Sequence, residues 1–293
     1  MKVCLKCKET FVSKNWVCPR CGSFPRKKNG YLSFLSEAVC AEQGFDSGYY
    51  PQLASLEEKN FWFRFRNKLL LWAIRRHFPG SERFLEIGSG TGFVLSGLHN
   101  DFPEMKIIGS DIYPQGLDYA RQRVPDATFL HMDACNIPFE DEFDLIGMFD
   151  ILEHIQDDQK VLNQVGKAVH ENGGIILTVP QYKWIWSAQD NAAFHVRRYS
   201  RKELRSKVEA AGFTIVYMTS FITLLFPLLV FSRLAANYIE RSDVPHDWTR
   251  ELRLHPFINA AFETLCNLEL LFLKKSVRMP VGSSILCIGV KKE

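Results

Sequence analysis

The chain has 293 residues, of which 46% are apolar and 24% are charged, and its formal net charge at pH 7 is +3. This is the composition of a globular protein, so it excludes a wholly disordered chain and a polytopic membrane protein. The small positive charge falls short of the basic character of a dedicated nucleic-acid-binding protein. The length suits one large α/β domain with a small additional unit.

Two closely spaced cysteine pairs mark the first part of the sequence. Cys4 and Cys7 form one pair, and Cys18 and Cys21 form the other. Four thiolates at this spacing can close a tetrahedral zinc site, and four protein ligands leave no position for water, so the metal would be structural. Iron in a rubredoxin-like site is the minor alternative. We therefore predict a small zinc ribbon over residues 1–30.

After an irregular segment at 31–55, the sequence predicts a helix over 56–77, which Pro79 and Gly80 stop. Beyond it, strand-like and helix-like runs alternate, as they do in a parallel sheet covered by helices. The predicted strands are 83–87, 106–111, 128–132, 143–149, 174–179, 214–218 and 284–290. The predicted helices are 92–99, 114–123, 157–171 closed by Asn172–Gly174, and one from the capping box Ser200–Glu203 to Gly212.

A glycine-rich turn follows the first of these strands. Gly88, Gly90 and Gly92 stand between the strand and an apolar helix, where a side chain would block a ligand from the backbone. Asp111 ends the next strand and can hydrogen-bond to ribose hydroxyls. NAD-dependent oxidoreductases share these parts. Two differences favour S-adenosylmethionine: the Gly-x-Gly-x-Gly spacing, and Glu86, whose carboxylate can pair with the ammonium group of a methionine moiety.

This stretch resembles motif I of the class I S-adenosylmethionine-dependent methyltransferases, with Asp111 as the acid of their second motif. The resemblance continues through 131–134 and 149–154 and covers roughly 56–220 and the final strand. It implies an α/β domain over 31–293 with a doubly wound, Rossmann-like, seven-stranded sheet whose last strand is antiparallel. The cofactor-binding residues that it implies are Glu86, Gly88, Ser89, Gly90, Gly92, Asp111, Ile112, Asp133, Ala134 and Phe149.

The acceptor side is expected at the carboxyl ends of the fourth and fifth strands. Methyl transfer is an in-line displacement, so the protein supplies positioning, and a base if the acceptor is a hydroxyl. His154 and His195 are the candidate bases, with Asp190 placed to orient His195. A histidine at a strand end is also often a hydrogen-bonded wall residue, so both interpretations of His154 stay open.

Four residues near His195 are candidates for binding the substrate. Arg197 and Arg198 could clamp a phosphate or carboxylate, although they could also form a solvated basic turn before the next helix. Tyr199 and Trp186 complete the set. Together with the aromatic run at 61–64, this segment resembles bacterial methyltransferases of glycans and lipid-linked polysaccharides.

The same resemblance suggests that Arg64 or Arg66 reaches the methionine carboxylate of the cofactor. A helical insert is predicted over about 221–280. Its apolar run 221–234 is shorter than the roughly 20 residues that cross a bilayer, so we expect packing, with a peripheral membrane contact as the alternative. The sequence starts without an apolar leader, and we expect a cytoplasmic protein.

The sequence thus predicts methyl transfer from S-adenosylmethionine to an oxygen or nitrogen of a small molecule, glycan or lipid-linked saccharide. A zinc-ribbon methyltransferase of ribosomal RNA is an alternative, in which Arg26, Lys27 and Lys28 would contact phosphates. A non-catalytic zinc-ribbon binding or scaffold protein is another. Nucleic acid is the less favoured partner, and the sequence does not determine the oligomeric state.

Overall fold

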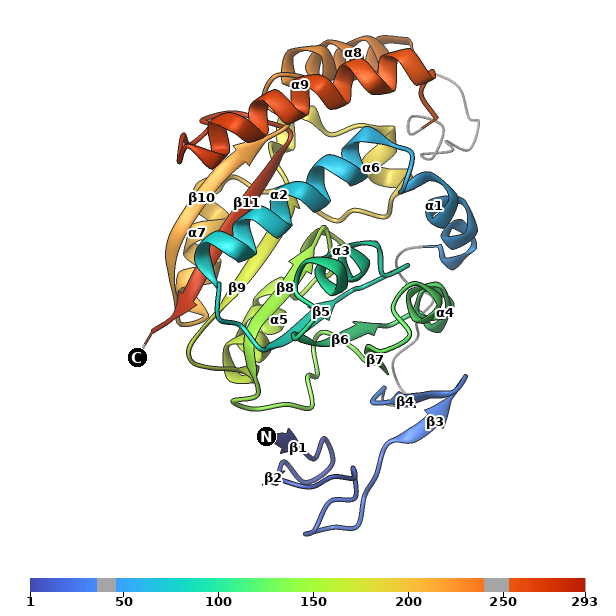
Figure 1. The fold of residues 1–293 in the computed structure, drawn as a ribbon, viewed down its shortest axis with the longest axis vertical. Helices are drawn as coiled ribbons and strands as arrows, with labels where there is room; N and C mark the ends of the chain where they lie inside the picture. The colour runs from blue at the N-terminus through green and yellow to red at the C-terminus, as the bar shows by residue number, and fades with distance from the viewer. Residues whose placement is uncertain (36–45, 240–252, 293) are drawn as a thin grey trace.

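The computed structural model describes residues 1–35, 46–239 and 253–292. Its centre is one nine-stranded sheet in the order β10-β11-β9-β8-β5-β6-β7-β4-β3 (Figure 1). The strands of this sheet are β3 (Arg26–Lys28), β4 (Tyr31–Ser33), β5 (Arg83–Ile87), β6 (Lys106–Asp111), β7 (Thr128–His131), β8 (Phe143–Phe149), β9 (Val169–Pro180), β10 (Phe213–Phe221) and β11 (Ser284–Lys291).

The seven predicted strands are all present, and their directions agree with the prediction. Strands β7, β6, β5, β8 and β9 are parallel, while β11 runs antiparallel between β9 and β10. The hairpin of β3 and β4 extends the edge of the sheet beside β7 and was not predicted. Its strands have three residues each, too few to show a periodic pattern. The predicted domain boundary near residue 30 falls at the turn of this hairpin.

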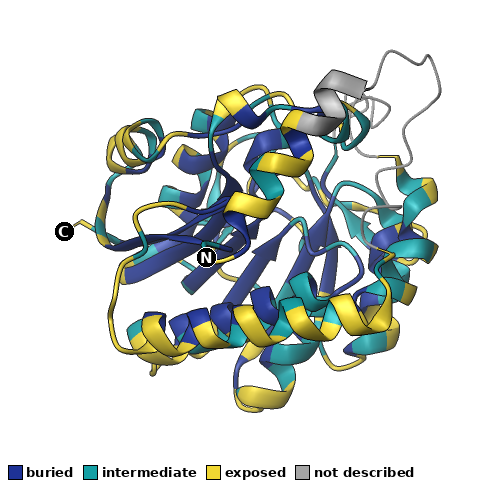
Figure 2. Ribbon diagram, turned by 90° about the horizontal axis from the view of Figure 1, so that it is seen from above, coloured by how far each residue is buried: buried dark blue, intermediate teal, exposed yellow. Residues whose placement is uncertain are grey.

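Helices cover both faces of the sheet, as they do in a doubly wound fold (Figure 2). Phe84 and Leu145 point to the face covered by α2 (Phe61–His77), α3 and α4, whereas Leu85 and Ile146 point to the face covered by α5 and α7. This follows from the alternation of side chains along a strand. The bounds are α3 Phe93–Asp101, α4 Pro114–Arg123, α5 Asp158–Ala168, α6 Ala188–Ala192 and α7 Arg201–Ala210, with 3-10 turns η1 Ser47–Tyr49, η2 Leu152–His154 and η3 Lys183–Ile185.

Two predicted helices have different bounds in the structure. The helix expected over 56–77 begins only at Phe61, as α2, because the side chain of Asn60 accepts a hydrogen bond from the Trp62 amide and caps the helix there. A separate helix, α1 (Tyr50–Leu56), lies almost wholly in the segment 31–55 that was expected to be irregular. The helix expected to run to residue 171 ends at Ala168, and β9 begins next to it. Asn172, with φ 64°, belongs to an irregular stretch of β9 rather than to a helix cap.

The predicted helical insert consists of α8 (Phe226–Ile239) and α9 (Pro256–Lys274), between β10 and β11. Helix α9 lies along α2, where the side chain of Asn259 accepts a hydrogen bond from the Phe61 amide at 2.8 Å. By length and composition α9 could cross a membrane, and 22% of its most apolar window is buried. Only one side of this helix packs against the domain.

The cysteine-bearing unit, residues 1–24, is docked on the main domain at the end opposite α8 and α9 (Figure 1). Its two short strands, β1 (Lys2–Val3) and β2 (Thr10–Phe11), pair antiparallel. The Val3 amide donates to the carbonyl of Pro138 at 2.9 Å. Trp16 packs edge-on against Phe34 and Phe139, with ring centroids at 4.6 and 5.4 Å. The unit therefore shares an apolar contact with the large domain.

Candidate functional site

A cavity of about 520 Å³ opens at the carboxyl ends of β5, β8 and β9. Its walls come from the glycine-rich turn, the segment after β8, the segment around α6, and helices α2 and α8. The predicted site residues that line it are Glu86, Gly88, Ser89, Gly90, Phe149, His154, Asp190, His195 and Arg198. Tertiary folding thus brings five of the ten predicted cofactor residues and four acceptor-side candidates to one cavity.

Two glycines of the turn are required by its geometry. Gly88 has φ 72°, and a β-carbon there would lie 2.2 Å from Cδ1 of Ile151. Gly92 has φ 74°, and its β-carbon would lie 2.7 Å from the Cα of Ala120 in α4. Side chains are excluded at both places. Gly92 does not line the cavity, so its observed contribution is to let the start of α3 approach α4.

Asp111 lies at the end of β6, close to the glycine-rich turn. Its carboxylate accepts hydrogen bonds from the amides of Gly90 at 2.8 Å and Tyr113 at 2.9 Å. The Tyr50 hydroxyl also bonds to it, and the Tyr50 ring lines the cavity. Burial raises the pKa of Asp111 to about 6, and these hydrogen bonds oppose the rise. Neither Asp111 nor Ile112 reaches the cavity surface, so Tyr50 covers the position predicted for the ribose.

Glu86 is a buried carboxylate in the cavity wall. Only 3% of the residue is exposed, and its Oε2 has no hydrogen-bond partner among the described residues. Burial raises the pKa of Glu86 well above its ordinary value, and Arg66 opposes this rise. An orphaned carboxylate oxygen in a cavity suits an ammonium group, which would donate to it. Glu86 therefore fits the methionine end of S-adenosylmethionine.

Of the two arginines considered for the methionine carboxylate, Arg66 lines the cavity. It forms an ion pair with Asp150 and lies over the ring of Trp62, 4.5 Å from its centroid. Arg64 points to α9 instead and pairs with Glu263 there. Arg66 is thus the arginine positioned for the cofactor.

On the acceptor side, Asp190 joins two cationic or titratable side chains. Its Oδ1 accepts from Nδ1 of His195 at 2.8 Å and from Nε of Arg198 at 2.7 Å. Burial raises the pKa of Asp190, but the bonds from His195 and Arg198 outweigh burial and lower it to about 2. Asp190 is therefore a carboxylate at neutral pH, and it orients the His195 ring as predicted.

His154 faces His195, with ring centroids 4.8 Å apart. Burial and, to a smaller extent, the nearby His195 together lower the pKa of His154 to about 3, although a hydrogen bond with the backbone of Phe194 opposes the shift. At neutral pH His154 is thus uncharged and a weaker base than an ordinary histidine. This geometry disfavours its predicted role as general base.

Three residues predicted to contact the substrate do not line the cavity. Arg197 pairs with Asp158 at 2.8 Å, and the Tyr199 hydroxyl donates to the same carboxylate at 2.7 Å. Tyr199 is fully buried. Trp186 donates through its indole N–H to Asn191 at 2.9 Å. Asp158, in the first turn of α5, attracts both Arg197 and Tyr199 away from the acceptor side.

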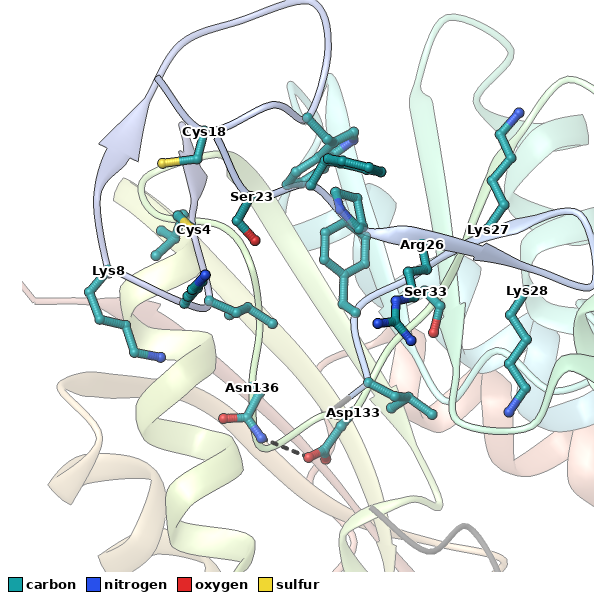
Figure 3. Close-up of a pocket in the computed structure, with 18 of the residues that line it drawn as sticks. Cys4, Lys8, Cys18, Ser23, Arg26, Lys27, Lys28, Ser33, Asp133 and Asn136 are labelled. Carbon is teal, nitrogen blue, oxygen red and sulfur yellow. Dashed lines mark hydrogen bonds between the residues drawn. The ribbon is translucent and has the colours of Figure 1, made fainter. Parts of the chain in front are cut away.

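Asp133 lies outside the cavity as well. Its carboxylate accepts from the Cys135 amide and from the Asn136 side chain, both at 2.8 Å, and neither Asp133 nor Ala134 lines the cavity. Asp133 lines a second, open groove of about 980 Å³ between the cysteine-bearing unit and the sheet edge (Figure 3). The contacts of Asp133 and Ala134 with adenine stay a prediction.

The four paired cysteines gather at the other end of this groove. Their sulfur atoms all lie within 4.8 Å of one another, with 3.6 Å between Cys4 and Cys21 and between Cys7 and Cys18. Zinc–sulfur bonds of about 2.3 Å in a tetrahedron place sulfurs about 3.8 Å apart. The arrangement of the thiolates therefore fits one tetrahedral zinc ion.

A buried cluster beside the glycine-rich turn was missed in the sequence. Glu57 accepts hydrogen bonds from the Thr91 hydroxyl at 2.6 and 2.7 Å and from Arg123 at 2.5 Å. It ties the segment after α1 to the turn and to the end of α4. Tyr50 was missed for the same reason, because neither residue belongs to a recognisable motif.

The comparisons with known proteins identify the family of the chain. The family model described as a methyltransferase domain matches residues 56–218. The demethylmenaquinone methyltransferase of Thermotoga maritima is 30% identical over 97 residues, which are 33% of this chain and 42% of that protein. The trans-aconitate 2-methyltransferase of Variovorax paradoxus is 26% identical over 196 residues, 62% of this chain and 71% of that protein. The chain spans less than half the length of the first curated relatives that it matches.

Solved structures show the same fold. A chain from the complex of the Haloferax volcanii Trm112 methyltransferase activator superposes with a TM-score of 0.56 at 17% identity, over 84% of this chain and 95% of that chain. Phosphoethanolamine N-methyltransferase 2 of Haemonchus contortus, in complex with S-adenosylmethionine, superposes with a TM-score of 0.52 at 17% identity, over 78% of this chain and 53% of that chain. These likenesses show the fold of the chain.

Proposed function

The chain belongs to the S-adenosylmethionine-dependent methyltransferases, and on this premise we propose that it methylates an oxygen or nitrogen of a lipid-linked saccharide at a membrane surface. Membership of this family decides against the NAD-dependent oxidoreductase. The relatives include methyltransferases of demethylmenaquinone, trans-aconitate and phosphoethanolamine, so the family itself leaves the acceptor open.

The observation that carries the proposal is the exposed apolar surface of α8 and α9. On α9, Phe257 is 81% exposed, and on α8, Phe231 is 72% exposed. Contiguous exposed apolar surfaces of this kind mark contacts with membranes or partner proteins. The further exposed apolar residues of the two helices and the segment just before α8 are Leu224, Leu228, Leu234, Ile258, Leu265, Leu268, Leu271 and Phe272.

Helix α8 connects this surface to the cavity. Leu228 and Leu229 line the cavity, and Leu228 is itself half exposed. A lipid chain lying along α8 would therefore bring its head group to the polar wall that holds His195 and Arg198. This arrangement supports an acceptor attached to a lipid and a cytoplasmic enzyme that binds the membrane peripherally.

We assign the following roles in cofactor and acceptor binding to residues of the chain. Bound S-adenosylmethionine supplies a methyl group on a positively charged sulfur. Glu86 holds the ammonium group, Arg66 the carboxylate, and Asp111 the ribose once the Tyr50 ring has moved aside. The acceptor lies between the cofactor and the wall of His195 and Arg198, where the reacting atoms are held in line.

Vesicle binding and methyl transfer test the proposal together. We expect radiolabelled methyl groups to enter the organic phase of a bacterial lipid extract, and the protein to float with anionic vesicles. Phe257→Glu with Phe272→Glu should reduce flotation at least about tenfold, because two buried charges oppose insertion. Val12→Glu is the matched control, since Val12 is 86% exposed on the cysteine-bearing unit at the other end of the molecule. The proposal would be contradicted if the double variant of Phe257 and Phe272 still floated with the vesicles while Val12→Glu did not.

The second groove supports one other acceptor class. Exposed Lys6, Lys8, Lys27 and Lys28 surround it, together with the half-exposed or exposed rings of Trp16 and Phe24. Basic side chains beside aromatic rings are typical of single-stranded nucleic-acid sites, which favours RNA as the alternative acceptor. Label transferred to total RNA rather than to lipid, and lost with Lys27→Glu and Lys28→Glu, would favour this function instead.

A further inference from the structure

Three potential metal ligands meet in the wall of the cavity. Glu153 and His154 lie in η2 after β8, and His195 follows α6. Their ligand atoms all lie within 4.8 Å of one another. The Val196 amide donates to the carbonyl of Glu153 at 2.8 Å, which fixes the two segments side by side. The cluster is therefore a product of backbone packing and not of a chance rotamer.

The cluster contains buried polar atoms that the described residues leave without partners. Glu153 is 1% exposed, yet its Oε2 has no hydrogen bond, and neither has Nδ1 of His154. Arg198, a cation in the same wall, is committed to Asp190 and to the carbonyl of Gln181. Orphaned buried atoms of this kind call for a ligand, because burying them unsatisfied costs free energy.

The surroundings of His195 match those of a metal-bound imidazole. Its Nδ1 is bonded to the carboxylate of Asp190 at 2.8 Å, so Nε2 is the nitrogen left to bind a ligand. Metal-binding histidines almost always have the other ring nitrogen bonded to an oxygen acceptor in this way, which fixes the tautomer and the ring orientation. Asp190 is in turn held by Arg198.

We propose that Glu153, His154 and His195 bind a divalent transition-metal ion at the acceptor end of the cavity. One carboxylate and two imidazoles suit Zn²⁺, Mn²⁺ or Fe²⁺, and three protein ligands leave positions open for a substrate atom. All three residues line the cavity that Glu86 and Gly88 also line, so the open positions face the space between the metal and the cofactor pocket.

The metal would act on an acceptor hydroxyl, a role that rests on the proposed function. Coordination of the oxygen lowers its pKa, and the proton leaves to solvent water. The oxygen then forms a bond to the methyl carbon, while the carbon–sulfur bond breaks and its electron pair stays on sulfur as the neutral thioether. A metal here would take the place of a general base.

Binding of Mn²⁺ to the full-length, zinc-loaded protein tests the site directly. Mn²⁺ prefers oxygen and nitrogen ligands, so it does not compete for the four thiolates. Electron paramagnetic resonance of free Mn²⁺ should show one ion bound per chain. We expect Glu153→Gln and His195→Ala each to weaken this binding at least about 100-fold, and Asp190→Asn to weaken it about 10-fold.

Control variants and a second readout keep the result interpretable. His170→Gln, in a histidine of β9 remote from the cluster, should bind Mn²⁺ like the wild type. Calorimetry with S-adenosylmethionine checks that every variant is folded. Wild type that binds neither Mn²⁺ nor a second equivalent of Zn²⁺, or variants that bind like the wild type, would overturn the metal site. If metal binds at this cluster but no radiolabelled methyl group enters the lipid extract, the proposed acceptor would be wrong while the metal site would stand.

Discussion

At the scale of single residues, two equally buried glutamates differ in their hydrogen bonds and in their place relative to the cavity. Glu86 and Glu269 are both almost fully buried, at 3% and 0% exposure. Glu269 accepts hydrogen bonds from the amides of Thr223 at 2.7 Å and Leu224 at 3.1 Å and so fixes the chain ahead of α8. Each carboxylate has one oxygen without a hydrogen-bond partner among the described residues, but only Glu86 lines the cavity, where a ligand can satisfy it.

These two residues give a paired prediction. Glu86→Gln should weaken S-adenosylmethionine binding about 10- to 100-fold, since a hydrogen bond to a charged group contributes about 1.5–3 kcal/mol. The thermal stability of this variant should stay equal or rise, because the change replaces a buried carboxylate with a neutral amide of the same shape. Glu269→Gln should do the reverse, with cofactor affinity unchanged and stability lowered by about 1–3 kcal/mol. Calorimetry and thermal melts measure both effects, and a stability loss in Glu86→Gln with intact affinity would refute this pairing.

At the scale of elements, the start of β9 is tied to β8 and β5 through one carboxylate. Asp144 accepts from the amides of Glu82 at 2.8 Å and Arg83 at 2.7 Å, and it pairs with His170. Burial lowers the pKa of His170, but its bonds to the Glu171 carbonyl and to Asp144 outweigh this and raise it. Burial raises the pKa of Asp144, but His170 and the two amides lower it overall.

The pair predicts a pH window for stability. The His170 contribution is fully present below its ordinary pKa of 6.5 and is lost as the pH rises through the raised folded value. The Asp144 contribution is present above 3.8 and is lost as the pH falls through its lowered folded value. His170→Gln should therefore cost most between these limits, by at most about 1 kcal/mol because the pair is partly exposed. Urea unfolding of wild type and variant from pH 4 to 9 measures this.

His99→Gln is the control for this experiment, because His99 belongs to the last turn of α3 and lies outside the pair. If the difference in free energy of unfolding between wild type and His170→Gln grew steadily above pH 8, its pH dependence would have the wrong sign, and the ion pair could not be its cause.

At the scale of the whole molecule, the cysteine-bearing unit and the cavity lie at separate ends joined by the sheet. Trp16 connects the unit to the main domain by packing against Phe34 and Phe139. The cavity shares no lining residue with the groove beside the unit. We therefore expect the unit to affect folding and partner recognition without altering cofactor affinity.

Metal removal tests this separation. A strong chelator, or Cys18→Ser, should lower the melting temperature by several degrees, because a unit this small holds its fold through the metal. Trp16 fluorescence should change in the same step, while affinity for S-adenosylmethionine per folded molecule stays within about twofold. Cys135→Ser is the matched control, as Cys135 lies outside the cluster of four. Unchanged melting and Trp16 fluorescence in chelator would exclude a structural metal.

The sequence by itself determined the order of the strands and helices, the glycine-rich turn and the likeness to the methyltransferases. These features are local: alternation of apolar residues, capping residues and glycines that no side chain can replace each act within a few neighbours. The same locality explains the failures. The sequence missed the three-residue strands β3 and β4, and it took the irregular start of β9 for a helix end.

Only the tertiary structure decided which side chains share the cavity. Arg66 pairs with Asp150 and lines the cavity, whereas Arg64 pairs with Glu263 on α9. Arg198 lines the cavity, whereas Arg197 and Tyr199 contact the distant Asp158. The meeting of Glu153 and His154 with His195 depends on a backbone contact across about 40 residues. Long-range contacts of this kind follow from packing, which no local pattern encodes.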